Sequence, residues 1–207
     1  TALPENGLEG TAELRWGSAA NERAGVVGLT AGKGPLALRV EGASRRAGDY
    51  RVGSGWAGGR KVDGSFNETD TGSIGLSWIG SAGYLGLAYT RQQAQYGLPG
   101  HTHGFEDCHT HGLGANMHLH CGGHGHADHD DHDHDDHDHD HDHSVPVVDM
   151  TSHRWDVRGQ WNAPLQGIEA VRLRASHTRY GHDEIEGDAV ATRFRNRAHD
   201  VRVEVQH

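Results

Sequence analysis

The sequence predicts an all-β protein: an antiparallel up-and-down transmembrane β-barrel, with about eight strands of a larger barrel present. One long extracellular loop rich in histidine and aspartate is expected between two of the strands. Three observations predict this. Apolar and polar residues alternate with period two outside one segment, as in strands with one apolar face. Short turns alternate with long loops. Only 34% of the 207 residues are hydrophobic, which is little for a packed soluble core.

Eight segments have the composition of strands. In five of them, apolar residues or glycine alternate with mostly charged residues, from residues 8–16 near the start to residues 201–205 near the end. Two further segments, 71–79 and 83–95, are richer in glycine and aromatic residues, and residues 23–31 make an eighth. No segment has the period of an amphipathic helix. In order, the expected strands are 8–16, 23–31, 36–40, 71–79, 83–95, 154–161, 171–176 and 201–205.

The lengths of the connections differ systematically. Every second connection is short and carries the glycine, proline or asparagine of a tight turn: residues 32–35, 80–83 and 162–167. The alternate connections are mostly long and are expected at 48–70, 96–150 and 182–198, whereas the one near 18–22 is short. In an up-and-down meander, alternate connections lie at the same end. Short turns at one end and long loops at the other are typical of an outer-membrane barrel.

The two faces of the strands differ in chemistry, which bears on the solvent around them. In a transmembrane barrel the apolar face contacts outer-membrane lipid and the polar face lines a wet lumen. Candidates for the interfacial aromatic girdle are Trp16, Tyr89, Trp155 and Trp161. Candidates for the lumen are Arg172, Arg174, Arg202 and Glu204. The alternative is a soluble β-sandwich, in which the apolar face packs on a second sheet.

The net charge of −10 comes from one segment. Residues 128–143 contain nine aspartates and seven histidines, and removing the aspartates changes the charge from −10 to −1. No basic patch dominates, so a nucleic-acid partner is not expected. No run of 18 apolar residues occurs, which excludes a transmembrane helix. The motifs of zinc proteases, serine hydrolases and P-loop enzymes are also missing, and no enzymatic activity is expected.

The loop at 96–150 concentrates possible metal ligands, because 15 of the 20 histidines lie between His101 and His143. Pairs of histidines two residues apart point to the same side of an extended chain. Imidazole suits Zn²⁺, Cu²⁺ or Ni²⁺, and ligand type does not separate these ions. The Asp/His tract at 128–143 favours a high-capacity metal collector over a solvated acidic spacer. The candidate ligands are His101, His103, Asp107, His109, His111, His118, His120, His124, His126, His129, His132 and His134.

The only two cysteines, Cys108 and Cys121, lie in the same loop. In an oxidising compartment they would form a disulfide, which contributes roughly 2–4 kcal/mol by constraining the unfolded loop. The alternative is a pair of thiolate zinc ligands. An extracellular position favours the disulfide, because exposed thiols oxidise there.

Several motifs resemble the ZnuD-type zinc receptors of the TonB-dependent outer-membrane receptor family. The similarity begins with a Leu-Pro-Glu-Asn-Gly run at residues 3–7, which resembles the junction after the plug domain of these receptors. It continues with a Tyr-Gly-Leu-Pro-x-His-x-His run at 96–103 and the Asp-Cys-His triplet at 107–109. Shorter matches occur on both sides of these motifs, in the same order along the chain, so the similarity covers nearly the whole chain: residues 48–50, 71–78, 180–184 and 187–190.

The resemblance implies a barrel of about 22 strands, plugged by an N-terminal domain and driven by the TonB complex. Residues 1–207 would supply roughly the first eight strands, so the chain is expected to be a fragment. The resemblance further implies a zinc site shared between plug and barrel, to which Glu184 contributes with His182 nearby. It also implies that Cys108 and Cys121 form the disulfide of an outer zinc-collecting loop.

The expected function is therefore zinc uptake across the outer membrane of a Gram-negative bacterium, with the long loops extracellular. Metal would be captured by the loop at 96–150 and passed to an internal site that includes Glu184. Two alternatives come from other classes. One is a metal-buffering or adhesive surface protein with a small closed barrel. The other is a soluble periplasmic metallochaperone built as a β-sandwich.

Overall fold

The computed structural model describes residues 4, 7–54, 59–99 and 145–207, together with the backbone of residues 108–111 and 118–121. The chain divides into two compact units. The first comprises Thr1–Pro99 and Val145–His207, and the second comprises Gly100–Ser144. No helix in the described part of the chain is long and apolar enough to cross a membrane.

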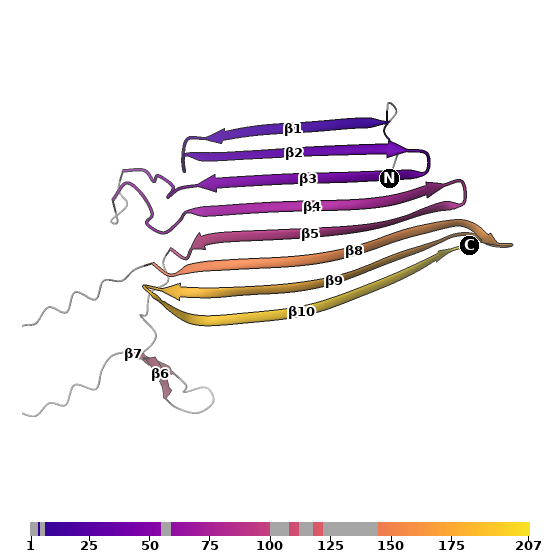
Figure 1. The fold of residues 1–207 in the computed structure, drawn as a ribbon. Coiled ribbons are helices and arrows are strands. Elements are labelled where there is room, and N and C mark those ends of the chain that lie inside the picture. The colour runs from indigo at the N-terminus through magenta and orange to yellow at the C-terminus, as the bar shows by residue number, and fades with distance from the viewer. Residues whose placement is uncertain (1–3, 5–6, 55–58, 100–107, 112–117, 122–144) are drawn as a thin grey trace, which may run out of the picture. The chain divides into compact units, whose positions relative to one another are not determined.

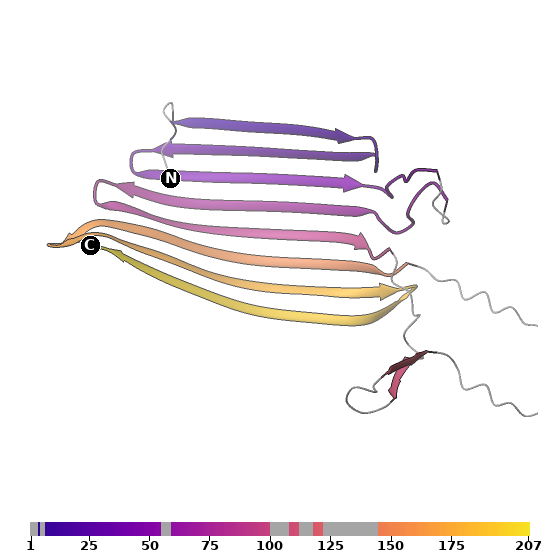
Figure 2. The same ribbon diagram turned by 180° about the vertical axis from the view of Figure 1, so that it is seen from behind.

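The first unit is a single eight-stranded sheet in which each strand pairs with its neighbours in the chain (Figure 1). All pairs are antiparallel, so the predicted all-β, up-and-down arrangement is confirmed. Figure 2 shows the same order from behind. The strands are β1 (Leu8–Gly17), β2 (Glu22–Lys33), β3 (Leu36–Ala47), β4 (Asn67–Gly80), β5 (Gly83–Gly97), β8 (Val147–Leu165), β9 (Ile168–Glu186) and β10 (Ala189–Gln206).

All eight predicted strands are present, but several are longer than expected, and one predicted loop is wrong. The prediction of a long connection at 182–198 fails, because β9 continues to Glu186 and β10 begins at Ala189. Only Gly187 and Asp188 join them. In this region both faces of the strands carry polar residues. The alternation of apolar and polar residues that identifies a strand is therefore lost here. The backbone ladder does not need apolar side chains and continues regardless.

The connections otherwise follow the predicted asymmetry. Two residues separate the strands at each of the three short turns, which lie at one end of the sheet. The connections at 48–66 and 98–146 leave from the other end. Gly83 shows why one tight turn needs glycine. Its φ is 144°, and a Cβ there would overlap the backbone carbonyl of Gln160 on β8.

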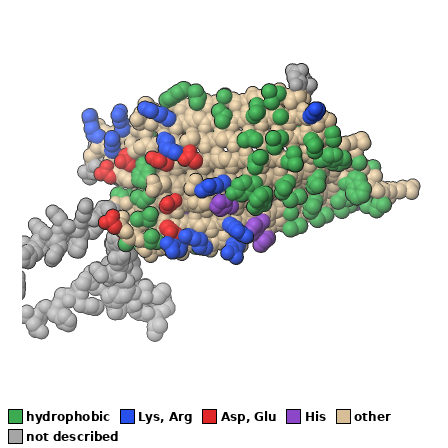
Figure 3. All heavy atoms as spheres, in the orientation of Figure 1, with side chains coloured by type: hydrophobic (Ala, Val, Ile, Leu, Met, Phe, Trp, Pro, Cys, Tyr) green, Lys and Arg blue, Asp and Glu red, His purple; other side chains and the backbone are tan. Residues whose placement is uncertain are grey.

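One face of the sheet carries an apolar band next to the short turns (Figure 3). The register sets apolar residues side by side across the strands, as in the row Leu38–Leu76–Leu87–Val157. Most of these side chains are exposed, because no second layer of strands pairs with or covers this face within the unit. The apolar band comprises Leu8, Val27, Leu29, Leu36, Leu38, Val40, Ile74, Leu76, Trp78, Leu85, Leu87, Trp155, Trp161, Leu173, Val201, Val203 and Val205. Leu14 and Trp16 are exposed on the same face, at the other end of β1.

Almost nothing in the described residues is buried. The buried apolar residues are small and scattered (Ala37, Ala47, Ala94, Val148 and Ala170), and no described polar or charged residue is buried. An exposed apolar surface of this extent is unusual for a soluble monomer and marks contact with another apolar phase or a partner.

The opposite face carries mostly polar side chains. The register places Arg172, Arg174, Arg202 and Glu204 on this one face, and Arg172 lies 3.9 Å from Glu204. The predicted girdle residues Trp16, Tyr89, Trp155 and Trp161 lie on the other, apolar face. The two faces of the sheet therefore have the chemistry that the alternation predicted.

An ion-pair cluster on the polar face ties the first three strands together at the end remote from the short turns. Glu22, the first residue of β2, accepts a hydrogen bond of 2.8 Å from Arg15 on β1 and one of 3.1 Å from Arg45 on β3. The hydrogen bond from Arg45, together with the charges of both guanidinium groups, lowers the pKa of Glu22 below its ordinary value of 4.5.

The lowered pKa predicts that acid loosens this edge of the sheet. A carboxyl group whose pKa is lowered by folding stabilises the folded state above its ordinary pKa, and loses that effect as the pH falls through the lowered value. Amide hydrogen exchange in β1, corrected for its intrinsic pH dependence, should therefore accelerate in acid. Glu22→Gln should exchange faster already at neutral pH and lack the acid-dependent step. Glu9→Gln, on the same polar face, is the control and should retain it; an acid step that survives in Glu22→Gln would contradict the assignment.

Candidate metal site

The second unit contains a short antiparallel hairpin in the histidine-rich loop. It is formed by β6 (Cys108–His111) and β7 (His118–Cys121). The register sets position 109 opposite 120 and position 111 opposite 118. Because residues two apart share one face of a strand, all four histidine positions belong to the same face of the hairpin. The backbone register is compatible with the expected grouping of these histidines, and their role as metal ligands stays a prediction.

The same register sets Cys108 directly opposite Cys121. Opposed residues of an antiparallel pair have Cα atoms about 4.5–5.5 Å apart, which lies within the span of a disulfide. The pairing therefore satisfies the backbone requirement for the predicted bridge, while the bridge itself stays a prediction.

Several predicted ligands lie outside the described residues. They are His101, His103, Asp107, His124, His126, His129, His132 and His134, together with the rest of the Asp/His tract.

The two predicted internal ligands, His182 and Glu184, lie on the polar face of β9. They are two residues apart in a continuous strand, and both are half-buried. Glu184 is in register with Val148 on β8 and with Thr192 on β10. It forms no ion pair with any described residue, so its carboxylate is available to a cation.

An aromatic group on the same face orients the His182 ring. The Tyr180 hydroxyl lies 3.0 Å from His182 Nδ1, and the Phe194 ring stacks on the imidazole with centroids 5.3 Å apart. When Nδ1–H donates to the Tyr180 oxygen, Nε2 carries the lone pair that a metal ion needs. The neighbours of His182 thus provide the kind of support that positions a metal ligand.

The acidic residues 183, 184 and 186 cluster in sequence, but the structure separates Asp183 from Glu184. Asp183 lies on the opposite face, where Arg195 Nη1 approaches it to 2.7 Å and Arg193 Nη2 to 3.0 Å. The hydrogen bonds from Arg195 and Arg193 lower the pKa of Asp183. Its charge is therefore neutralised in place, whereas the Glu184 charge is not.

The described residues supply only part of a metal site. No group of three or more His, Cys, Asp or Glu side chains that could hold an ion occurs among them. Zinc sites in proteins are almost always four-coordinate. A site built on His182 and Glu184 would need further ligands from other segments.

The base of the histidine-rich loop is anchored to the sheet and to the 48–66 connection. The Leu98 N–H donates to the Pro146 carbonyl at 2.9 Å, and the Gly97 N–H donates to the Phe66 carbonyl at 3.3 Å. A Cβ at Gly97 would overlap the backbone carbonyl of Gly64. The loop thus leaves the sheet through a close backbone contact at the same end as Glu184.

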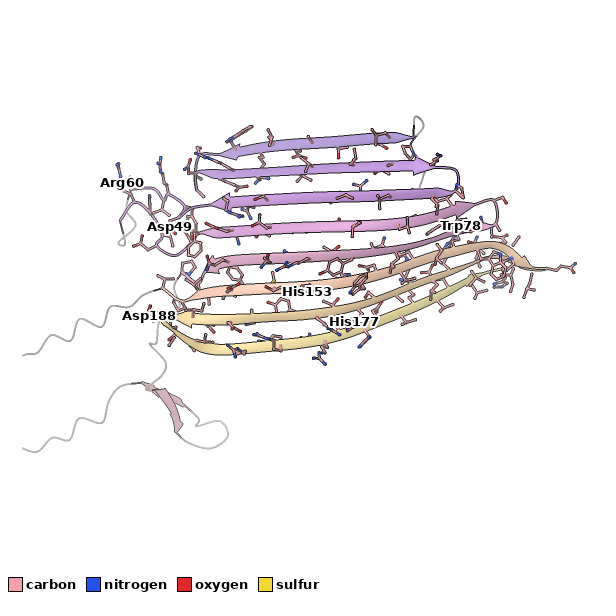
Figure 4. All side chains as sticks on the ribbon, in the orientation of Figure 1. Asp49, Arg60, Trp78, His153, His177 and Asp188 are labelled. Atoms are coloured by element: carbon pink, nitrogen blue, oxygen red, sulfur yellow. The ribbon has the colours of Figure 1, made fainter. Side chains whose placement is uncertain are left out.

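Sequence reasoning did not identify one charged feature of the apolar face. Arg91, His153, Arg179 and Arg197 lie in one register row across β5, β8, β9 and β10. Figure 4 shows His153 and His177 on the adjacent strands β8 and β9. A signal was present, because each of the four residues lies two positions from an aromatic residue or a histidine. Only the register shows that they line up.

No model of a known protein family matches this chain. The fold, the two faces of the sheet and the candidate ligands are the features that bear on its function.

Proposed function

We propose that this chain forms part of the wall of an outer-membrane zinc receptor in a Gram-negative bacterium. The apolar band faces lipid, the polar face lines the lumen, and the long connections are extracellular. Zinc ion is the cargo, and the TonB complex supplies energy through a plug domain. No bond is made or broken in this function, so we expect no enzymatic activity.

One observation carries the proposal. His182 and Glu184 lie on the polar face near the same end of the sheet from which the histidine-rich loop leaves. A metal ion collected by the loop would therefore have a carboxylate and an oriented imidazole on the lumen side of the wall. The uncovered apolar band on the other face supports the membrane setting, because lipid would remove it from water.

The proposed mechanism has two stages that use different ligands. The loop at 96–150 offers many interchangeable imidazoles and carboxylates, which favours high capacity and modest affinity. The inner site offers fewer ligands held by neighbouring side chains, which favours higher affinity. Zinc would pass from the loop to the inner site and leave after the plug rearranges. Ni²⁺ and Cu²⁺ suit the same ligand types and are the competing cargoes.

Accumulation of radioactive zinc by zinc-starved cells that express the complete protein tests the proposal. We expect uptake that stops when an uncoupler removes the proton-motive force, and that exceeds the uptake of nickel or copper under the same conditions. Zinc bound at the cell surface without uncoupler-sensitive uptake would instead indicate a metal-buffering protein. Recovery of the protein in the soluble periplasmic fraction would indicate a metallochaperone.

A further inference from the structure

A row of basic side chains crosses the lipid-facing side of the sheet near the boundary of the apolar band. We name Arg91, His153, Arg179 and Arg197 the basic row. The register pairs Arg91 with His153, His153 with Arg179, and Arg179 with Arg197. Four adjacent strands about 4.8 Å apart give the row a length of roughly 14 Å.

The rows next to it change chemistry in one direction. One step toward the short turns is the row Tyr89–Trp155–His177–His199, and a further step is Leu87–Val157–Ala175–Val201. Toward the short turns, the rows are first basic, then aromatic or histidine, and then apolar. Side chains of these types suit, in the same order, the lipid headgroups, the membrane interface and the hydrocarbon. Figure 3 shows histidine and basic side chains at the edge of the hydrophobic area.

The basic row is held in place but is not neutralised. The His153 Nδ1 lies 2.7 Å from the Tyr89 hydroxyl, and Arg179 Nε donates to His177 Nε2 at 3.3 Å. All three arginines are exposed, and none forms an ion pair with a described carboxylate. Their charges are therefore available to an external anion.

A shallow groove continues from the basic row away from the apolar band. His153, Arg179, Arg195 and Arg197 line it over β8, β9 and β10. Two carboxylates, Asp149 and Asp183, lie at its far end, and Asp183 is neutralised by its arginine partners. The cationic part of the groove is thus the part next to the apolar band.

We infer that the basic row and this groove bind the phosphate groups of an anionic lipid in the outward leaflet of the membrane. The inference rests on the proposed function, because it needs the apolar band to face lipid. A lipid fits better than a soluble anion, because its chains would cover the apolar band while its phosphates meet the row. The basic row is longer than a single phosphate group is wide, so a headgroup with two phosphates matches its length better.

The polar face offers a matched control in the same strands. Arg158, Arg174 and Arg202 also lie in one register row across β8, β9 and β10. Acidic residues surround them, and Arg202 pairs with Glu204 at 2.6 Å. Neutralising these three arginines changes the charge of the protein equally but leaves the lipid-facing side intact.

The test is native mass spectrometry of the complete protein in detergent, titrated with lipid A that carries two phosphates. Arg91→Gln/Arg179→Gln/Arg197→Gln should weaken lipid binding about tenfold or more, because each basic residue near an anionic lipid surface contributes to the attraction. Arg158→Gln/Arg174→Gln/Arg202→Gln should bind like the unmodified protein. The corresponding triple lysine variant of the basic row keeps the charge and should retain most of the binding, which separates loss of charge from misfolding.

Any one of the following results would overturn the inference: equal binding by the glutamine variant and the unmodified protein, equal losses in both glutamine variants, or displacement of the lipid by millimolar inorganic phosphate. Equal affinity for phosphatidylethanolamine, which carries no net charge, would overturn it as well. Zinc uptake in the same variants keeps this inference distinct from the proposed function. If the unmodified protein binds the lipid but takes up no zinc, the lipid-binding inference stands and the proposed receptor function fails. If it takes up zinc but does not bind the lipid, the receptor function stands and the lipid-binding inference fails.

Discussion

Zinc uptake at low external zinc is expected to fall about tenfold or more when Glu184 is replaced by glutamine. Glutamine keeps the size of the side chain and removes the charge that a cation needs. Glu184 has no ion-pair partner among the described residues, so the change breaks no such contact, and the fold should persist. Initial rates of radioactive zinc accumulation, measured over a range of zinc concentrations, check this result. Loss of a ligand of the inner site should lower uptake with the histidine-rich loop intact.

Two controls make the Glu184 experiment specific. Glu13→Gln removes the same charge from the same face of the sheet on β1 and should leave uptake unchanged. Deletion of 128–143 removes nine aspartates and seven histidines. It should lower the amount of zinc bound per chain but spare uptake at low zinc. Equal losses of uptake from the deletion and from Glu184→Gln would contradict the division between a collecting loop and an inner site.

Folding into a bilayer is expected to become about 2–4 kcal/mol less favourable when Leu76 is replaced by arginine. Leu76 is 53% exposed on the apolar face, in register with Leu38 and Leu87. If this face contacts hydrocarbon, the guanidinium group must leave water without a partner. The free energy of folding into lipid vesicles, from urea titrations followed by tryptophan fluorescence, measures the effect.

The matched variant is Ser73→Arg, on the same strand and on the opposite face. Ser73 is in register with Glu41 and Thr90, so an arginine there meets a polar surface that includes a carboxylate. We expect a change within about 1 kcal/mol, because lumen-facing substitutions have little effect on insertion. Equal costs for the two variants would show that the apolar band does not face lipid.

The fold was predictable from local patterns because a strand with one apolar face has a period of two. In residues 8–16 and 201–205 the alternation is complete, and both lie in strands. The pattern fails beyond the apolar band. Residues 182–198 carry polar side chains on both faces, so they were predicted as a loop, although β9 and β10 continue there as a paired hairpin. Main-chain hydrogen bonds hold these two strands together. Such bonds do not depend on the type of side chain, so the pattern of apolar and polar residues does not reveal them.

The candidate site was predictable only in part. Glu184 and His182 were identified by resemblance, and nothing local distinguishes Glu184 from Asp183 or Glu186. The structure distinguishes Glu184 from Asp183, because consecutive strand residues point to opposite faces and Arg193 and Arg195 neutralise Asp183. The support of His182 by Tyr180 and Phe194 was not foreseen, since Phe194 comes from the next strand.

The sequence by itself determined the strands, the asymmetry of short turns and long loops, and the division of residues such as Leu76 and Ser77 between two faces. These follow from spacing within one segment. The tertiary structure alone decided which residues of different strands lie side by side. Cross-strand register depends on turn lengths and on the whole hydrogen-bond ladder, which short stretches of sequence do not encode. For that reason the basic row, assembled from β5, β8, β9 and β10, exists only in the folded sheet.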